Sequence, residues 1–72
     1  MAKGENAVYR VTEVIGTSSN SWEDAVRSAV KTASKSLRDL RIAEISKLDV
    51  KIEDGKITQF RARLALSFKY DA

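Results

Sequence analysis

Residues 21–40 read SWEDAVRSAVKTASKSLRDL, and this stretch decides the fold. The hydroxyl of Ser21 is suited to cap a first helical turn, and Glu23 and Asp24 place negative charge at the positive end of the helix dipole. The apolar residues recur every three or four positions, which places them on one stripe of a helix. They are Trp22, Ala25, Val26, Ala29, Val30, Ala33, Leu37 and Leu40. We therefore predict a helix over residues 21–40.

The apolar stripe of this helix is unusually small in its middle. Ala25, Ala29 and Ala33 carry only a methyl group each, so a flat partner can approach the helix backbone closely. A β-sheet is such a partner, and the remaining apolar runs of the chain have the composition of strands. We predict a helix that lies on a sheet or is wrapped by it.

The segment before the helix divides into a strand and a connector. Residues 6–15 are rich in β-branched and aromatic side chains, which predicts a first strand. Residues 16–21 read GTSSNS and predict a polar connector. A Gly-Thr-Ser connector that opens a helix can hold a phosphate on free N–H groups, but this one lacks the lysine and second glycine of a P-loop. Capping of the helix is the favoured interpretation.

After Leu40 the hydrophobic period changes from about four to two, and residues 42–53 predict a second strand. Its apolar set changes phase between Ile45 and Leu48, which predicts a bulge or bend near residues 46–47, because a slip of one residue moves every side chain to the other face. Asp54-Gly55 then predicts a tight hairpin turn.

Residues 56–70 alternate strictly and predict a third strand of fifteen residues, paired with the second as a hairpin. One face of this strand is largely apolar and is expected to cover the helix, through Phe60, Ala62, Leu64, Leu66 and Phe68. The other face is polar. Because long exposed edge strands are normally paired or blocked, we predict that the strand, or its face with Gln59, Arg61 and Arg63, contacts another subunit.

Length and composition favour one domain, residues 1–72, that associates with itself. A chain of this size buries only about 60% of its unfolded surface as a monomer, and without cysteine or histidine it has neither disulfides nor the usual zinc ligands to support it. No apolar run approaches the ~18 residues of a membrane span, and no secretory leader is recognised. We expect a cytoplasmic protein with no membrane partner.

The chain has few side chains suited to acid–base catalysis. Carboxylates are the available acid–base groups, and their spacing brings no pair into an apolar cleft, so we predict that the chain is not an enzyme. Thirteen basic against ten acidic residues give a net charge of +3. A basic row runs along the polar side of the predicted helix through Arg27, Lys31, Lys35 and Arg38. It is either a solvated face or an anion contact. Nucleic acid is not expected as a partner, because such binding needs a strongly basic clustered surface.

The order strand, helix, strand, strand, with a Gly-Thr-Ser entry to the helix and an Asp-Gly hairpin, resembles the dodecin family. The matching stretches are Tyr9-Arg10-Val11, Val14-Ile15-Gly16-Thr17-Ser18, Leu37-Arg38-Asp39-Leu40, Ala43-Glu44-Ile45 and Ala65-Leu66-Ser67-Phe68-Lys69. The resemblance implies an α+β fold in which a three-stranded antiparallel sheet wraps around one helix. It also implies a bacterial-type, non-catalytic homododecameric shell, in which typical members hold flavins between tryptophans near the symmetry axes.

The resemblance assigns the cofactor-binding positions to Ile42, Glu44, Arg61 and Lys69. Typical members carry the flavin-stacking tryptophan where this chain has Ile42, and a ring-reading glutamine where it has Arg61. A basic residue common in the second strand is replaced by Asp49, whereas Lys69 keeps a cation near the end. Because an aromatic platform stabilises a stacked ring by about 1 kcal/mol beyond its buried area, flavin (FMN, FAD or riboflavin) is expected to bind weakly or not at all.

Some dodecin-like proteins without this tryptophan resemble cation-binding shells, and calcium is the ion implied. Candidate metal ligands are Glu44 and Asp49, with Glu13 and the oxygens of residues 17–21 as further hard ligands. The predicted function is a homododecameric shell that binds, stores or buffers a small ligand. A calcium-binding shell is the first alternative, and a nucleic-acid or anion-binding module is the second.

Overall fold

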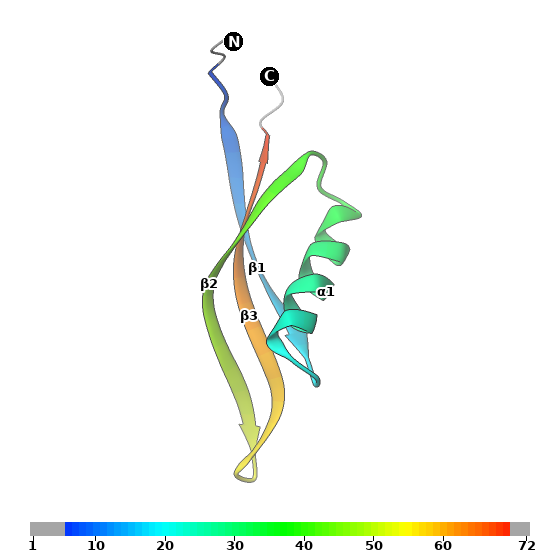
Figure 1. Cartoon of the computed structure of the whole chain (residues 1–72), viewed down its shortest axis with the longest axis vertical. Helices are drawn as coiled ribbons and strands as arrows, with labels where there is room; N and C mark the ends of the chain where they lie inside the picture. Colours follow the sequence, from blue (N-terminus) through cyan, green and yellow to red (C-terminus); the bar gives the residue numbers. More distant parts are fainter. Residues whose placement is uncertain (1–5, 70–72) are drawn as a thin grey trace.

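The computed structural model describes residues 6–69, which form one sheet and one helix in the order strand, helix, strand, strand. The elements are β1 (Tyr9–Ser18), α1 (Trp22–Ser34), β2 (Leu40–Glu53) and β3 (Lys56–Lys69). The strands pair antiparallel in the order β1-β3-β2, and α1 lies along one face of the sheet (Figure 1). The predicted α+β fold is confirmed.

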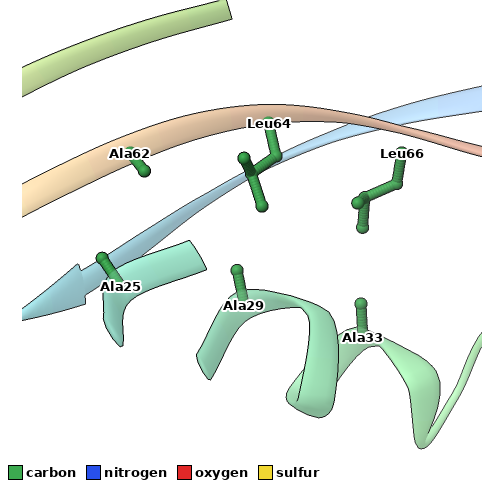
Figure 2. Packing of buried hydrophobic residues seen from close by; sticks show 6 residues of the cluster. All are labelled: Ala25, Ala29, Ala33, Ala62, Leu64 and Leu66. Atoms are coloured by element: carbon green, nitrogen blue, oxygen red, sulfur yellow. The ribbon is translucent and has the colours of Figure 1, made fainter. Parts of the chain in front are cut away.

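The core is a thin seam between α1 and the central strand β3. It consists of Ala25, Ala29 and Ala33 from the helix and Ala62, Leu64 and Leu66 from the strand (Figure 2). Alanine on the helix lets the two backbones approach, and Leu64 and Leu66 fill the remaining space with no exposed surface. The alanine stripe therefore faces a sheet, as its small size predicts.

Strand β1 runs three residues beyond the predicted strand end at residue 15, so the expected connector begins only after Ser18. Gly16 lies within the strand, where a Cβ atom would stand 2.2 Å from the carbonyl oxygen of Ala25. The glycine therefore serves close helix packing and does not turn the chain. Sequence reasoning placed it in a loop because glycine is more common there.

The start of α1 is capped as predicted. The Ser21 side chain accepts a hydrogen bond from the Asp24 backbone N–H at 3.0 Å. Ser18 adds a second layer, because its buried hydroxyl donates to Asp24 Oδ2 at 2.7 Å and accepts from the Asn20 N–H at 2.9 Å. The hydroxyls of this segment thus organise the helix entry.

The end of α1 differs from the prediction, since the helix stops at Ser34 and not at residue 40. The Ser34 hydroxyl donates to the Val30 carbonyl at 2.7 Å, and such back-bonding competes with helical backbone bonds. Asp39 then adopts a left-handed φ of 56°. Leu37 follows the helix and Leu40 begins β2, although both still pack against the core.

The predicted bulge and hairpin between the second and third strands are both present. The β2–β3 register shifts between Ile45 and Lys47, and the extra residue, Ser46, donates its hydroxyl to the Arg63 carbonyl at 3.1 Å. Asp54 and Gly55 have φ angles of 52° and 75°, as a type I′ turn requires.

Strand β3 is the central strand, which corrects the idea that its length marks an exposed edge. Its backbone is paired on both sides within the chain, by β1 and by β2. The edges that a second copy could pair with are the outer edges of β1 and β2. Tyr70, the predicted end of the third strand, lies outside the described residues.

The chain is long and thin, with extents of 55 × 21 × 16 Å. Its radius of gyration is 15.2 Å, against about 11 Å for a compact domain of this length. Many large apolar side chains consequently stay exposed, including Val8, Val11, Ile15, Ile42, Ile45, Leu48, Ile52 and Ile57. Within residues 6–69 no helix is long and apolar enough to span a bilayer.

Candidate functional site

The sheet face opposite α1, which we call the open face, carries the candidate ligand residues. Ala62, Leu64 and Leu66 of β3 are buried against the helix, so the odd-numbered residues from Arg61 to Lys69 project to the open face. The strand register then sets four rows across β1, β3 and β2. They are Val11–Ser67–Ile42, Glu13–Ala65–Glu44, Ile15–Arg63–Lys47 and Thr17–Arg61–Asp49.

The four predicted cofactor positions all lie on this face. Ile42 and Glu44 come from β2, and Arg61 and Lys69 come from β3. They are spread along it, because Lys69 and Arg61 are eight residues apart on one strand, about 26 Å. A single flavin ring is shorter than this span, so one chain does not gather these residues around one ring.

The bulge at Ser46 is what keeps the β2 candidates together on the open face. Glu44 lies opposite Ala65, and beyond the bulge Lys47 and Asp49 lie opposite Arg63 and Arg61. Without the extra residue, the second half of β2 would turn its polar side chains toward the helix side. The phase change in the sequence therefore predicts which face the candidate residues of β2 occupy, as well as the bulge itself.

Asp49 and Arg61 form a bidentate ion pair on the open face. Arg61 Nε donates to Asp49 Oδ1 at 2.8 Å and Nη2 donates to Oδ2 at 3.1 Å. The hydrogen bond from Arg61 holds the pKa of Asp49 below its ordinary value, and the carboxylate in turn raises the pKa of Arg61. A metal ion at Asp49 would therefore compete with Arg61 for the carboxylate, and part of the donor set of Arg61 is already occupied.

The two predicted metal ligands are not brought together within one chain. Glu44 and Asp49 lie in rows that are four β3 residues apart, about 13 Å. Glu13 shares a row with Glu44, and only the small Ala65 stands between them. Among residues 6–69 no group of three acidic, histidine or cysteine side chains is placed to hold a metal ion.

The candidate ligand oxygens of residues 17–21 do not all lie near the site. Ser18 and Ser21 are used in the helix cap. Thr17 is exposed and shares a row with Arg61 on the open face. The helix entry thus serves the structure of the chain, and only Thr17 adds an oxygen near the site.

Trp22 links the helix entry to the same end of the sheet, a contact that sequence reasoning missed. Its ring meets Phe60 edge to face with centroids 5.1 Å apart, and Nε1 donates to the Asp49 carbonyl at 3.0 Å. The side chain is nevertheless 39% exposed, so it is not a core residue of the single chain. A contact between residues so far apart in sequence leaves no local signal.

Only the first part of the predicted basic row lies on the helix. Arg27 and Lys31 lie on α1, Lys35 is its C-cap, and Arg38 lies in the turn that follows. All four are exposed. The row is therefore shorter on the helix than the predicted span of residues 21–40 suggested.

The chain is thus a small α+β protein with one helix on a three-stranded antiparallel sheet, and its candidate ligand residues lie on the face away from that helix. A family model described as Dodecin matches residues 8–71. The chain therefore belongs to the dodecin family. It is 44% identical over 64 residues to a calcium dodecin of Mycobacterium tuberculosis, an alignment that covers 88% of this chain and 89% of the relative.

Solved structures agree with this assignment. A dodecin from Streptomyces coelicolor superposes with a TM-score of 0.87 at 42% identity, covering 93% of this chain and 96% of that one. The crystal structure of the M. tuberculosis calcium dodecin, described as having a novel calcium-binding site, gives a TM-score of 0.79 at 41% identity and covers 90% and 93% of the two chains.

Proposed function

We propose that this chain assembles into a homododecameric, non-catalytic shell that binds a small ligand on the open face at sites completed by neighbouring copies. One observation carries the proposal. The candidate ligand residues share one face, yet lie too far apart on a single chain to surround one small molecule. The exposed apolar side chains and the elongated shape also favour assembly. A cytoplasmic location stays a prediction.

Flavin is the first ligand to test, because family resemblance points to the open face as a flavin surface. Ile42 is 56% exposed there and offers an aliphatic contact in place of an aromatic platform. Arg61 is held by Asp49, so reading a ring edge would require it to leave this partner or share its donors. We expect riboflavin to bind weakly or not at all.

Calcium is the second candidate ligand. The 44% identical relative is a calcium dodecin, and Glu13 and Glu44 flank Ala65 in one row of the open face. Their backbones are two strand spacings apart, about 10 Å, so one ion would sit between the two edge strands. Calcium takes six to eight oxygens, so further ligands would have to come from water or neighbouring copies.

Mass and ligand titration test the proposal together. Size-exclusion chromatography with light scattering should give about 96 kDa, twelve times the 8.0 kDa chain. A single-chain mass would refute the shell. Calorimetric titration with calcium, and quenching of riboflavin fluorescence, then separate the two ligands. If neither binds at millimolar concentration, the ligand part of the proposal fails.

A gain-of-function variant sharpens the flavin test. Ile42→Trp places an aromatic surface at an exposed position. Its Kd for riboflavin, measured by fluorescence quenching, should be at least tenfold lower than that of the native chain. Ile15→Trp places the same side chain on the opposite edge strand of the same face and serves as the matched control. Equal quenching by both variants would show that the Ile42 position is not special.

A further inference from the structure

Two cationic side chains lie opposite each other on the open face. Lys47 pairs directly with Arg63 in the row that starts at Ile15, so the Cβ atoms of the two residues are about 5 Å apart. Both residues are exposed. The ion pairs within residues 6–69 join other side chains, and neither Lys47 nor Arg63 takes part in one. Like charges in this arrangement repel each other, so the pair favours an anion that contacts both.

The fold holds this basic pair in place. The bulge residue Ser46, next to Lys47, donates its hydroxyl to the Arg63 carbonyl at 3.1 Å. Because the bulge adds one residue to β2, Lys47 falls on the same face as Arg63 and not on the helix side. Both residues stand on paired strands, which position side chains more precisely than loops do. The basic pair is therefore fixed by the register of the hairpin.

The nearest acidic residues leave the pair unneutralised. Asp49, in the next row, is held by Arg61 through two hydrogen bonds of 2.8 and 3.1 Å. That contact, and to a smaller extent the charge of Arg63, lowers the pKa of Asp49. Glu13 and Glu44 lie in the row on the other side, about 7 Å along the strands. Their repulsion weakens the hold on any anion, so an anion with two charges is favoured over one with a single charge.

We propose that Lys47 and Arg63 form an oxyanion subsite on the open face that takes a phosphate group, free or as a monoester. The planar fork of Arg63 can donate two parallel hydrogen bonds to phosphate, and the Lys47 ammonium adds a mobile point charge. A phosphate dianion balances both cations at once. The subsite rests on the proposed function in taking the open face as the ligand surface, and it gives the ligand a chemical class. It lies within one chain and does not need the shell to form.

Phosphate titration of the full chain tests the subsite. Inorganic phosphate and glycerol phosphate are titrated separately by phosphorus NMR at constant ionic strength and about pH 8, where phosphate is mostly a dianion. Saturable binding of either probe is expected, and the tighter probe shows whether the free or the esterified form fits better. Lys47→Gln and Arg63→Gln should each raise the Kd about tenfold, because each removes charge-assisted hydrogen bonds.

Two further variants sharpen the titration. Lys51→Gln is the matched control, because it removes the same charge from the same strand at a lysine that already pairs with Glu53 at 3.6 Å. It should leave the Kd unchanged. Glu44→Gln removes a repelling charge from the neighbouring row and should lower the Kd about threefold.

Three results would overturn the subsite. The first is no saturable binding of either probe to the native chain. The second is equal weakening by Lys47→Gln and Lys51→Gln, which would show only diffuse attraction. The third is a loss of assembled mass in Lys47→Gln with no phosphate binding, which would assign the pair to a contact between copies.

The proposed function is tested apart from the subsite. A single-chain mass with phosphate binding intact refutes the shell and keeps the subsite. A large assembly that binds calcium or riboflavin but no phosphate keeps the proposed function and refutes the subsite.

Discussion

Gly16 leaves no room for a side chain beneath α1. In Gly16→Ala the new Cβ would lie 2.2 Å from the Ala25 carbonyl oxygen and 2.8 Å from the Ala29 Cβ. Neither neighbour is a flexible side-chain end, so α1 has to move away by at least about 0.8 Å. A gap of this size already forfeits a quarter to a half of the dispersion energy of the contacts it opens.

The shift loosens the seam between α1 and β3, in which Ala25, Leu64 and Leu66 have no exposed surface. Overpacking typically costs about 1–3 kcal/mol, and displacement of the whole helix places Gly16→Ala near 3 kcal/mol. The total stability of such a chain is roughly 4–11 kcal/mol. With a urea slope of about 1 kcal/mol/M, the midpoint should fall by about 3 M at fixed protein concentration.

Gly55→Ala is the matched control, because nothing lies within 4 Å of its added Cβ and only its φ of 75° resists the change. A left-handed alanine costs about 1 kcal/mol, so this variant should lose about 1 M. If Gly16→Ala is as stable as the native chain, or no less stable than Gly55→Ala, the argument for close packing of α1 on β1 is refuted.

Three further predictions concern the polar contacts. Ser18→Ala should lower the free energy of unfolding by about 1–2 kcal/mol because it removes a buried cap partner, and a loss no larger than that of the exposed Ser19→Ala would contradict this. The lowered pKa of Asp49 means that its ion pair stabilises the fold above the ordinary carboxyl pKa and is lost as pH falls below about 4. The urea midpoint of the native chain should therefore drop more between about pH 6 and about pH 3 than the midpoint of Asp49→Asn does. Equal drops in the two midpoints would show that the Asp49–Arg61 pair does not stabilise the fold. Trp22→Phe removes the donation to the Asp49 carbonyl and should cost about 1 kcal/mol in urea unfolding; an unchanged midpoint would show that the bond contributes nothing net.

Much of the candidate site was predictable because period-two alternation assigns side chains to faces. The phase change near Ser46 predicted the bulge, and the bulge brings Glu44 and Asp49 to the same face. The Asp49–Arg61 pair was not predictable, because it depends on the cross-strand register on a hairpin with further irregularities. Its consequence for metal binding became visible only with the two side chains in place.

The sequence by itself determined the features that depend on near neighbours. Ser21 and the charges after it specify the helix start, the alanine stripe specifies a flat partner, and Asp54-Gly55 specifies the hairpin. Each is a matter of local hydrogen bonding, side-chain size or φ, which a few consecutive residues settle.

Only the tertiary structure decided where α1 stops, how far β1 continues and which strand is central. Leu40 fits the helical period, yet pairing with Phe68 in the sheet draws it into β2. Gly16 has the composition of a loop, yet the approach of α1 makes it a strand residue. In each case a contact between distant segments outweighs the local preference, because packing and sheet hydrogen bonds form only once those segments meet.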